Sequence, residues 1–481
     1  MLLKKTCLLA AAAFLALCPA FAQEAATSDE GGNGELTKYR RSSLYSVLVK
    51  HSDFPYSAEI ESAFMVMPIP DKFNDHNIDL RSFESSAVKM KKKGRGKTER
   101  NKKDIARFMS QNQIAKALVA RWFDRNPETG GFGMDLIQSR GFYDASQLDI
   151  STARESSRGM SALGDAGEQL IGNTFLIFND ITFVDKGERS SNVSGFLSLA
   201  GSLMSELSGD SSYQTVGDLA AGAANEIDGF RVNITTYLYR LVWNDEVAAT
   251  FYQNYWFGGE EDNPERRSAF DASDIFTVDY VGETTTSAAN LASKSFSSKS
   301  KGAQMLKVCT RAVDKAIVEL QREYDEFKVN VPIYRISEDG KTVDVQIGLK
   351  EGINEKSRFE VLMPVEDEDG NMQYEKIGMI QPEKGKIWDN RFGALEEARE
   401  AASEDGSKSK DEDAADLESA MLTASTFKVT SGAGKIVPGC LVREVTIKRG
   451  SWQGSFARSP SLPTCPSPAE VTICQSGRLG T

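Results

Sequence analysis

The stretch AQMLKVCTRAVDKAIVELQREYDEFKVNVPIYRI, residues 303–336, contains the clearest structural pattern in the chain. Apolar side chains recur every three or four residues through its first two thirds, and charges of both signs fill the positions between, which is typical of an amphipathic α-helix. The pattern then changes to alternation, so the helix is expected to lead directly into a β-strand. The predicted buried stripe consists of Met305, Cys309, Ala312, Ala316, Leu320, Tyr324 and Phe327.

The chain after this helix has the pattern of a small β-barrel. The alternating segments 327–336 and 341–349 flank the turn SEDG, which predicts a hairpin with an Asp-Gly turn. Further short strands with polar turns predict a barrel domain over 331–449. Residues 395–422 interrupt it with ten acids, which indicates an exposed insert that is helical or disordered. The Pro- and Ser-rich residues 450–481 are interpreted as a flexible tail.

The chain before the helix predicts a mixed α/β domain over residues 104–330. DIARFMSQNQIAKALVARWFDR, residues 104–125, has helical periodicity with a break near Asn112, and a second helix is expected over 160–171. Residues 188–228 have leucines at helical spacing among Gly, Ala and Ser, so they predict an inserted helix. A transmembrane β-hairpin would alternate instead.

Several strands are expected in the same domain. The apolar run TFLIFNDITFV, residues 174–184, is typical of a buried strand. GFRVNITTYLYRLVW (229–243) and VAATFYQNYWF (247–257) predict a strand pair around a turn at Asn244, and IFTVDYVG (275–282) predicts another strand. Aromatic residues concentrate on that pair, where cross-strand packing explains them better than sugar stacking does. They are Tyr237, Tyr239, Trp243, Tyr252, Tyr255, Trp256 and Phe257.

Residues 23–88 predict a flexible leader and a short helical region. QEAATSDEGGNGELT, residues 23–37, is small, polar and Gly-rich. Leu44, Val47 and Leu48 recur at helical spacing, and the pattern repeats at residues 60–67 before two prolines. Two short helices are therefore expected before an extended connection.

The N-terminus has the three parts of a cleaved secretory signal over residues 1–22. Lys4 and Lys5 precede an apolar run that is too short to span a bilayer, and Ala-Phe-Ala precedes Gln23. The alternative is a lipoprotein signal in which Cys18 is acylated, although Leu17 and Pro19 are unsuitable neighbours. Cleavage would take the net charge from −12 to −14, because it removes two lysines and no acid. No later apolar run is long enough to predict a transmembrane helix.

The segment KMKKKGRGKTERNKK, residues 89–103, contains nine basic residues and one acid. Gly94 and Gly96 favour a flexible linker that would bind an anionic surface by charge alone, at about 1 kcal/mol per basic residue near a charged membrane. Export would exclude nucleic acid as a partner and leave anionic envelope surfaces or an acidic protein. A solvated linker without a partner is the simpler interpretation of this segment. The candidate patch consists of Lys89, Lys91, Lys92, Lys93, Arg95, Lys97, Arg100, Lys102 and Lys103.

The sequence contains no recognisable catalytic or cofactor motif. His51 and His76 are the two histidines, which excludes a metal site built mainly from imidazoles, and neither H-E-x-x-H nor G-x-S-x-G occurs. The simplest interpretation puts His51 at the end of a helix and His76 in a polar loop. Four cysteines would follow the signal; Cys309 is expected to be a small buried hydrophobe. No catalytic residue, metal site or cofactor is predicted.

The order of elements resembles known envelope proteins. A strand such as NTFLIFNDITFV, paired strands, a long helix and a further strand together resemble the α/β accessory domain of the curli secretion channel lipoprotein family and its flagellar and TolB-related cousins. The following barrel, from GLKEGINEKSRFEVL to GKIVPGCLVREV, is similar to the SH3-like C-terminal domain of some of them. IWDNRF and LIGNTF resemble an uncharacterised family of exported envelope proteins from Gram-negative anaerobes. This resemblance implies an envelope location and no particular activity.

We therefore expect an α+β protein with a short helical N-terminal region, a mixed α/β central domain and an SH3-like barrel. Its expected location is the periplasm or the outer membrane, with the extracellular space as an alternative and peripheral membrane association as one mode of attachment. The expected role is non-catalytic binding or assembly in the cell envelope. The alternative is a secreted hydrolase or glycan-active enzyme with dispersed carboxylates, which two facing carboxylates in a cleft would favour. An open sheet edge would favour assembly.

Overall fold

The computed structural model describes residues 40–86, 95–143, 170–183, 231–259, 261–289, 301–366, 372–403 and 410–445, all within one compact unit, Met1–Val445. Both helices and β-sheets are present, so the fold class is α+β, as predicted. Within these ranges, no helix combines the length and the apolar character that crossing a bilayer requires.

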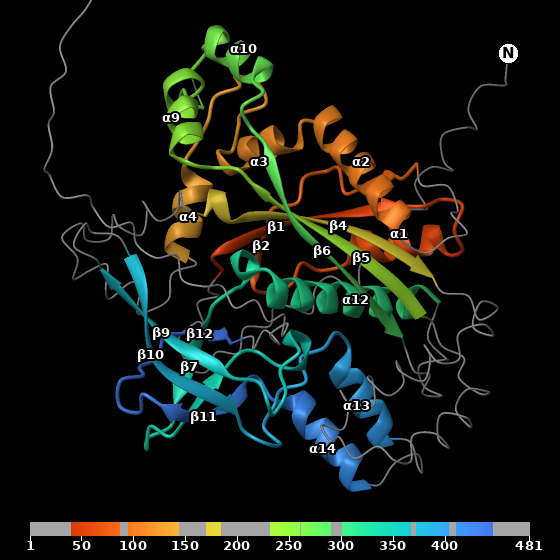
Figure 1. Ribbon diagram of the computed structural model, residues 1–481, viewed down its shortest axis with the longest axis vertical. Helices are drawn as coiled ribbons and strands as arrows, with labels where there is room; N and C mark the ends of the chain where they lie inside the picture. The colour runs from red at the N-terminus through yellow and green to blue at the C-terminus, as the bar shows by residue number, and fades with distance from the viewer. Residues whose placement is uncertain are drawn as a thin grey trace, which may run out of the picture. The chain divides into compact units, whose positions relative to one another are not determined.

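A six-stranded sheet forms the central layer (Figure 1). Its order is β2-β1-β4-β5-β6, and β3 pairs with the same edge of β1 as β2 does. The first strands run parallel to β1, whereas β5 is antiparallel to both of its neighbours. The strands are β1 (Ser42–Lys50), β2 (Phe73–Asp75), β3 (Ser82–Glu84), β4 (Thr174–Phe183), β5 (Arg231–Leu241) and β6 (Val278–Ala289).

Helices cover both faces of this sheet, and Figure 1 shows α12 on one side with α2 and α3 on the other. The α12 side also holds α1, and its core forms between these two helices and the sheet. The opposite side holds α2, α3, α4, α9 and α10. The helices are α1 (Ser57–Val66), α2 (Arg95–Gln111), α3 (Ile114–Trp122), α4 (Asp135–Tyr143), α9 (Asp245–Asn254), α10 (Pro264–Ala272) and α12 (Lys301–Glu323), with a short 3-10 turn, η1 (Ile171–Asn173), before β4.

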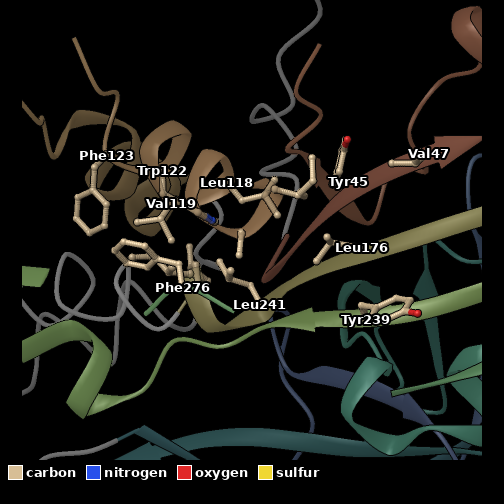
Figure 2. Close-up of a cluster of buried hydrophobic side chains, with 14 of the residues drawn as sticks. Tyr45, Val47, Leu118, Val119, Trp122, Phe123, Leu176, Tyr239, Leu241 and Phe276 are labelled. Atoms are coloured by element: carbon tan, nitrogen blue, oxygen red, sulfur yellow. The ribbon is translucent and has the colours of Figure 1, made fainter. Parts of the chain in front are cut away.

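Because successive side chains of a strand point to opposite faces, both cores draw on the same strands. In β1, Tyr45 and Val47 face the α3 side, whereas Leu44 and Leu48 face α12. Figure 2 shows Trp122 of α3 packed toward the sheet side chains. Burial on both faces explains the near-continuous apolar sequence of these strands.

The long helix α12 confirms the predicted stripe from Met305 to Leu320, whereas Tyr324 and Phe327 lie beyond the end of the helix. Met305, Cys309 and Leu320 are fully or almost fully buried against the sheet, and Cys309 is a free thiol, as expected. The helix ends before the 3-10 turn η3 (Asp325–Phe327), which leads into the barrel. Burial of such a stripe supplies about 25 cal/mol for each Å² of apolar surface removed from water.

Six short strands form a closed ring after α12 in the order β10-β11-β8-β7-β12-β9. Every neighbouring pair is antiparallel, and the predicted hairpin is confirmed, with Gly340 at φ 65° in its Asp-Gly turn. The strands are β7 (Val331–Ile336), β8 (Thr342–Val345), β9 (Phe359–Glu366), β10 (Met372–Pro382), β11 (Ser425–Ser431) and β12 (Leu441–Glu444), with a 3-10 turn, η4 (Leu349–Glu351), after β8.

The acidic insert is helical where the structure describes it, as α13 (Ala394–Ser403) and α14 (Lys410–Met421). Glu397 of α13 forms ion pairs with Lys307 and Arg311 on the polar face of α12. The Arg311 Nη2 to Glu397 Oε2 distance is 2.7 Å. The insert therefore contacts α12 through charge, while the rest of its acidic surface includes many exposed residues.

The helix predicted around Leu44–Leu48 is wrong, because Ser42–Lys50 forms strand β1. Seven consecutive residues of this strand are buried, so apolar side chains occur on both faces of the strand. A run that is apolar on both faces has no strict alternation and can match helical spacing by chance. The second expected helix, over residues 60–67, is confirmed as α1.

The returning strand predicted at 247–257 is also wrong, because Asp245–Asn254 forms helix α9. Asn244 does not make a hairpin turn; its side chain accepts a hydrogen bond from the backbone N–H of Val247 and caps the helix. Two acids in the first turn add a favourable interaction with the helix dipole. The antiparallel partner of β5 is instead β6, which begins at Val278.

The basic segment is not a linker throughout, because the backbone from Arg95 onward belongs to α2. The predicted break near Asn112 is confirmed: Gln113 has φ 47°, and it separates α2 from α3. The signal, the leader, Lys89–Lys93, most of the helix expected over 160–171, the insert 188–228 and the tail 450–481 lie outside the described residues.

Asp314 of α12 forms a buried charged contact with the chain around the barrel. Its Oδ1 lies 4.0 Å from Lys350 Nζ, and Asp71, Lys72 and Glu351 also face this contact. Burial raises the pKa of Asp314 to about 6, although the Lys350 ammonium opposes the shift. Between its usual pKa and about 6, the folded protein therefore binds a proton that the unfolded chain releases.

We predict that this group stabilises the fold below pH 4 and that its contribution is lost as the pH rises through 6. The free energy of unfolding should therefore fall by on the order of 3 kcal/mol between pH 4 and pH 7, because the pKa of Asp314 is raised by about two units. Asp314→Asn should flatten the decline in unfolding free energy between pH 4 and 7, measured by urea denaturation. Glu319→Gln on the same helix is the control and should keep the wild-type slope. An unchanged slope in Asp314→Asn would contradict the assignment.

Candidate functional site

A buried polar cluster lies at the carboxyl ends of the parallel strands β1 and β4. His51 directly follows β1, and its Nε2 lies 2.9 Å from Oδ1 of Asp180, near the end of β4. Both side chains are at least 95% buried. The carboxyl edge of parallel strands is where ligands bind in many α/β proteins. The cluster consists of His51, Ser85, Asn101, Asp104, Asp180 and Tyr237.

Asn101 links helix α2 to this edge of the sheet. Its Nδ2 donates to Asp180 Oδ2 at 2.8 Å and lies 3.2 Å from the Tyr237 hydroxyl oxygen. Its Oδ1 accepts a hydrogen bond from Ser85 Oγ at 3.0 Å. Because Asn101 is fully buried, these bonds replace water that the amide has lost.

Asp104, one turn further along α2, adds a second carboxylate. It accepts hydrogen bonds from the backbone N–H and the hydroxyl of Ser86, each at 2.8 Å. Ser85 Oγ also lies 3.3 Å from Asp104 Oδ2 and thus bridges it to Asn101. The two carboxylates of the cluster are therefore connected through one serine and one amide.

The His51–Asp180 pair has the chemistry of an oriented base. An ionised Asp180 can only accept, so His51 Nε2 carries the proton of this hydrogen bond. Nδ1 is buried and has no hydrogen-bond partner among the described residues, and the ring stacks on Phe54 at 4.7 Å. No solvent-exposed surface reaches this atom, so the geometry favours a structural role, in which the cluster holds α2 against β1, β4 and β5.

His76 lies in the loop after β2, as expected, but its side chain is buried. Arg140 donates to its Nδ1 at 3.1 Å, and its Nε2 therefore donates to the Leu118 carbonyl at 3.0 Å. Burial lowers the pKa of His76 to about 3, so the ring stays neutral between Arg140 and the stacked Trp122. It joins α3 and α4 to the end of β2.

A hollow beside α12 and the barrel contains two further carboxylates, Glu351 and Glu444. Glu444 lies 3.3 Å from Arg322 Nη2, and Glu351 lies 3.4 Å from Lys72 Nζ and accepts from the Gly348 backbone. These pairings favour a structural role for both acids. Among the described residues, no group of three His, Cys, Asp or Glu side chains is placed to hold a metal ion.

The sheet ends at β6, which pairs with β5 along its whole length and with no other described strand. Glu283 N–H points away from β5, because it donates to the Tyr324 hydroxyl at 3.3 Å. Alternate residues of an antiparallel strand point their backbone groups the same way, so those of Thr285, Ser287 and Ala289 also face outward. We call Thr284–Ala289 the open edge; its sequence TTTSAA contains neither charge nor proline.

Tyr324 marks one end of the open edge. A Cβ built on Gly282 would lie 2.0 Å from the Tyr324 ring, so only glycine lets this ring approach the strand. A β-bulge between Leu238 and Tyr239 places Val281 outside the regular pairing at the same point. The bulge and the tyrosine therefore end the accessible part of the edge before Thr284.

The opposite edge of the sheet is protected. Strands β2 and β3 have three residues each and pair with the two ends of β1. Between them, the Asn77 side chain accepts from the Ser46 backbone N–H at 2.9 Å. Short edge strands and side chains that occupy backbone groups are common means of preventing strand addition.

Three of the nine predicted patch residues have described side chains, and all three belong to α2. Lys102 Nζ lies 3.1 Å from Glu283 Oε2 and 4.5 Å from the Tyr280 ring centre, both on β6. Burial opposes the Lys102 charge, but the Tyr280 and Glu283 contacts outweigh it and raise its pKa above the usual range. Arg100 and Lys103 are exposed. The remaining six, Lys89, Lys91, Lys92, Lys93, Arg95 and Lys97, have no described side chain.

Sequence reasoning missed the polar cluster and the open edge. His51 and Asp180 are 129 residues apart, and no motif connects them. One signal was available: Asn179 and Asp180 interrupt the apolar strand TFLIFNDITFV, and buried polar residues usually have specific partners. The uncharged TTTSAA was a second signal, but an edge position cannot be inferred without the strand order.

Comparison with known proteins gives no assignment: no protein-family profile matches this chain, and no curated protein matches it. The cluster is buried and satisfied at most of its atoms, whereas the Thr285 and Ser287 backbone N–H groups of the open edge have no partner in the part of the chain that the structure describes. The open edge is thus the stronger candidate for a binding surface.

We predict that Asp180→Ala destabilises the protein by about 3 kcal/mol, because it leaves the buried His51 and Asn101 donors without their acceptor. Glu84→Ala is the matched control: its exposed carboxylate accepts from Ser52, and its loss should cost less than about 1 kcal/mol. Urea denaturation measures both. Equal losses in the two variants would show that the cluster does not hold α2.

Proposed function

We propose that this chain is an exported binding or assembly protein of the cell envelope without catalytic activity, and that the open edge supplies its binding surface. The observation that carries the proposal is the outward-facing backbone of Thr285, Ser287 and Ala289 on β6. Such an edge can accept an extended segment through main-chain hydrogen bonds. The protected edge at β2 and β3 makes β6 the side on which addition occurs.

The remaining parts of the proposal come from the sequence. The N-terminal signal and the resemblance to exported envelope families support a periplasmic or outer-membrane location. The closed ring of short antiparallel strands supports an SH3-like identity for the barrel. The buried state of His51 Nδ1 and the pairing of Glu351 and Glu444 favour binding over the alternative of a hydrolase or glycan-active enzyme.

We predict that Ser287→Pro abolishes partner capture through the open edge. Proline lacks the N–H that an added strand would use, and its ring occupies the space beside it. Crosslinking in intact cells, followed by identification of the captured proteins, measures the effect. Ser287→Ala is the matched control, because it keeps the N–H, and it should capture partners as the wild type does.

The thermal unfolding midpoint of both variants should stay within a few degrees of the wild-type value, which shows that the sheet is intact. If Ser287→Pro folds normally and still captures the same proteins, the open edge is not the binding surface. If Ser287→Pro and Ser287→Ala lose the same captured proteins, the proposal is also contradicted, because the effect would then come from loss of the serine side chain.

The basic segment supplies a second, electrostatic contribution to envelope attachment. Its net charge of +8 contrasts with an otherwise acidic chain, which favours an anionic envelope surface as its partner. We predict that replacing Lys91, Lys92, Lys93, Arg95 and Lys97 with Gln reduces binding to isolated envelope at low salt. The wild-type binding should itself weaken as salt rises, because screening shortens the range of the attraction. Unchanged binding at low salt would rule out this contribution.

A further inference from the structure

We infer that the segment added to the open edge is the open edge of a second copy of this chain. This inference rests on the proposed function and names its partner. The two β6 strands would pair antiparallel about a twofold axis through Ser287, so that Thr285 of one copy lies opposite Ala289 of the other. The outward backbone groups of Thr285, Ser287 and Ala289 then form the hydrogen-bonded pairs.

The spacing of free backbone groups supports this register. Thr285, Ser287 and Ala289 are evenly spaced around residue 287, so twofold pairing uses all of them in both copies. Neither the Thr285 nor the Ser287 backbone N–H has a partner among the described residues. Glu283 is unsuitable for pairing, because the Tyr324 hydroxyl already accepts from its N–H. A register centred nearer to Gly282 would therefore lose hydrogen bonds.

Charge supports the same register. Like charges directly opposite each other destabilise a strand pair. A twofold axis at Val281 would put Asp279 opposite Glu283, whereas an axis at Ser287 puts only uncharged residues opposite one another from Thr285 to Ala289. Glu283 itself faces Lys102 of its own chain, 3.1 Å away, so its charge is already compensated. Self-pairing at residue 287 thus places no like charges opposite each other between Thr285 and Ala289.

The side chains favour a second copy over an unrelated strand. A sheet edge that selects a foreign sequence does so with pockets for alternate side chains of the incoming segment. The open edge offers Thr, Ser and Ala, and Thr285 is occupied with Thr235 across β5 at 3.1 Å. Small side chains leave the backbone accessible but provide little selectivity. An identical edge needs no such pockets, because every copy carries the matching hydrogen-bond pattern.

The formation of a closed dimer is a further reason to expect self-pairing. Because β2, β3 and Asn77 protect the other edge, the sheet, as far as the structure describes the chain, has one side available for addition. Pairing of two identical open edges uses both and leaves a closed twofold dimer in place of an extending fibre. A long uncharged edge that stayed free would instead be an aggregation hazard.

The test uses paired cysteine variants of the full chain, in a background carrying Cys7→Ser, Cys18→Ser, Cys465→Ser and Cys474→Ser; Cys309 and Cys440 are buried. Ser287→Cys places the two sulfurs at the twofold axis, where hydrogen-bonded residues have Cα atoms about 5.5 Å apart, within disulfide range. Thr285→Cys is the matched control: its two copies would be about 14 Å apart along the strands, which is too far to bond. Mild oxidation should therefore give a disulfide-linked dimer from Ser287→Cys and background levels from Thr285→Cys.

Light scattering after size-exclusion chromatography gives the independent measurement. We expect twice the chain mass for the wild type and for Ser287→Ala, and the single-chain mass for Ser287→Pro. Equal crosslinking of both cysteine variants, or a wild type that remains a monomer at about 100 µM, would overturn the inference. A monomeric wild type whose envelope partner is lost in Ser287→Pro would refute self-pairing and leave the proposed function intact. A monomer with unaltered capture in Ser287→Pro would refute both.

Discussion

Helix α12 has to bury two different surfaces, and the rest of the structure depends on how it does so. Its apolar stripe, with Cys309 and Leu320, is removed from water by the sheet and α1. Its other side contacts the barrel and the acidic insert through charged groups that include Arg311, Asp314 and Arg322. The hydrophobic contact supplies most of the free energy of packing. The charged contacts fix the orientation of α12 relative to the barrel and the acidic insert, because each needs a specific partner at short range.

The central strands of the sheet are also constrained by burial. Strands β1 and β4 are buried on both faces, so their backbone and side chains are all committed to packing. Polar groups inside such a layer must find partners there. On the α12 face of the sheet, Thr236 Oγ1 donates to Asn179 Oδ1 at 2.9 Å. On the opposite face, Asn101 Nδ2 donates to Asp180 Oδ2. These bonds fix the register of the central strands and the position of α2 with directional contacts that apolar packing alone does not provide.

Elements with a single clear periodicity could be predicted from the sequence, and elements with other constraints could not. The apolar stripe of α12 and the hairpin around Gly340 each have one periodicity, and both predictions are confirmed. Strand β1 is buried on both faces, so its spacing matched a helix by chance. Helix α9 was missed because Asn244 can start either a hairpin turn or a helix, and tertiary packing of Phe251 decides between them.

The candidate site was less predictable than the fold, since it depends on contacts between distant residues. The basic segment could be identified by charge, but its continuation into α2 and the pairing of Lys102 with Glu283 could not. The open edge requires the strand order, and the polar cluster requires residues separated by more than a hundred positions to meet. Local composition contains neither piece of information.

The burial of Cys309 has a consequence for how this thiol responds to an oxidant. Burial raises the pKa of this thiol to about 12, and the sulfur lies in the core between α12 and the sheet. The thiolate, which is the reactive form, is therefore scarce in the native state. Mispairing with another cysteine can occur only before α12 packs or when it detaches, so the labelling rate of this one sulfur reports how often the core opens.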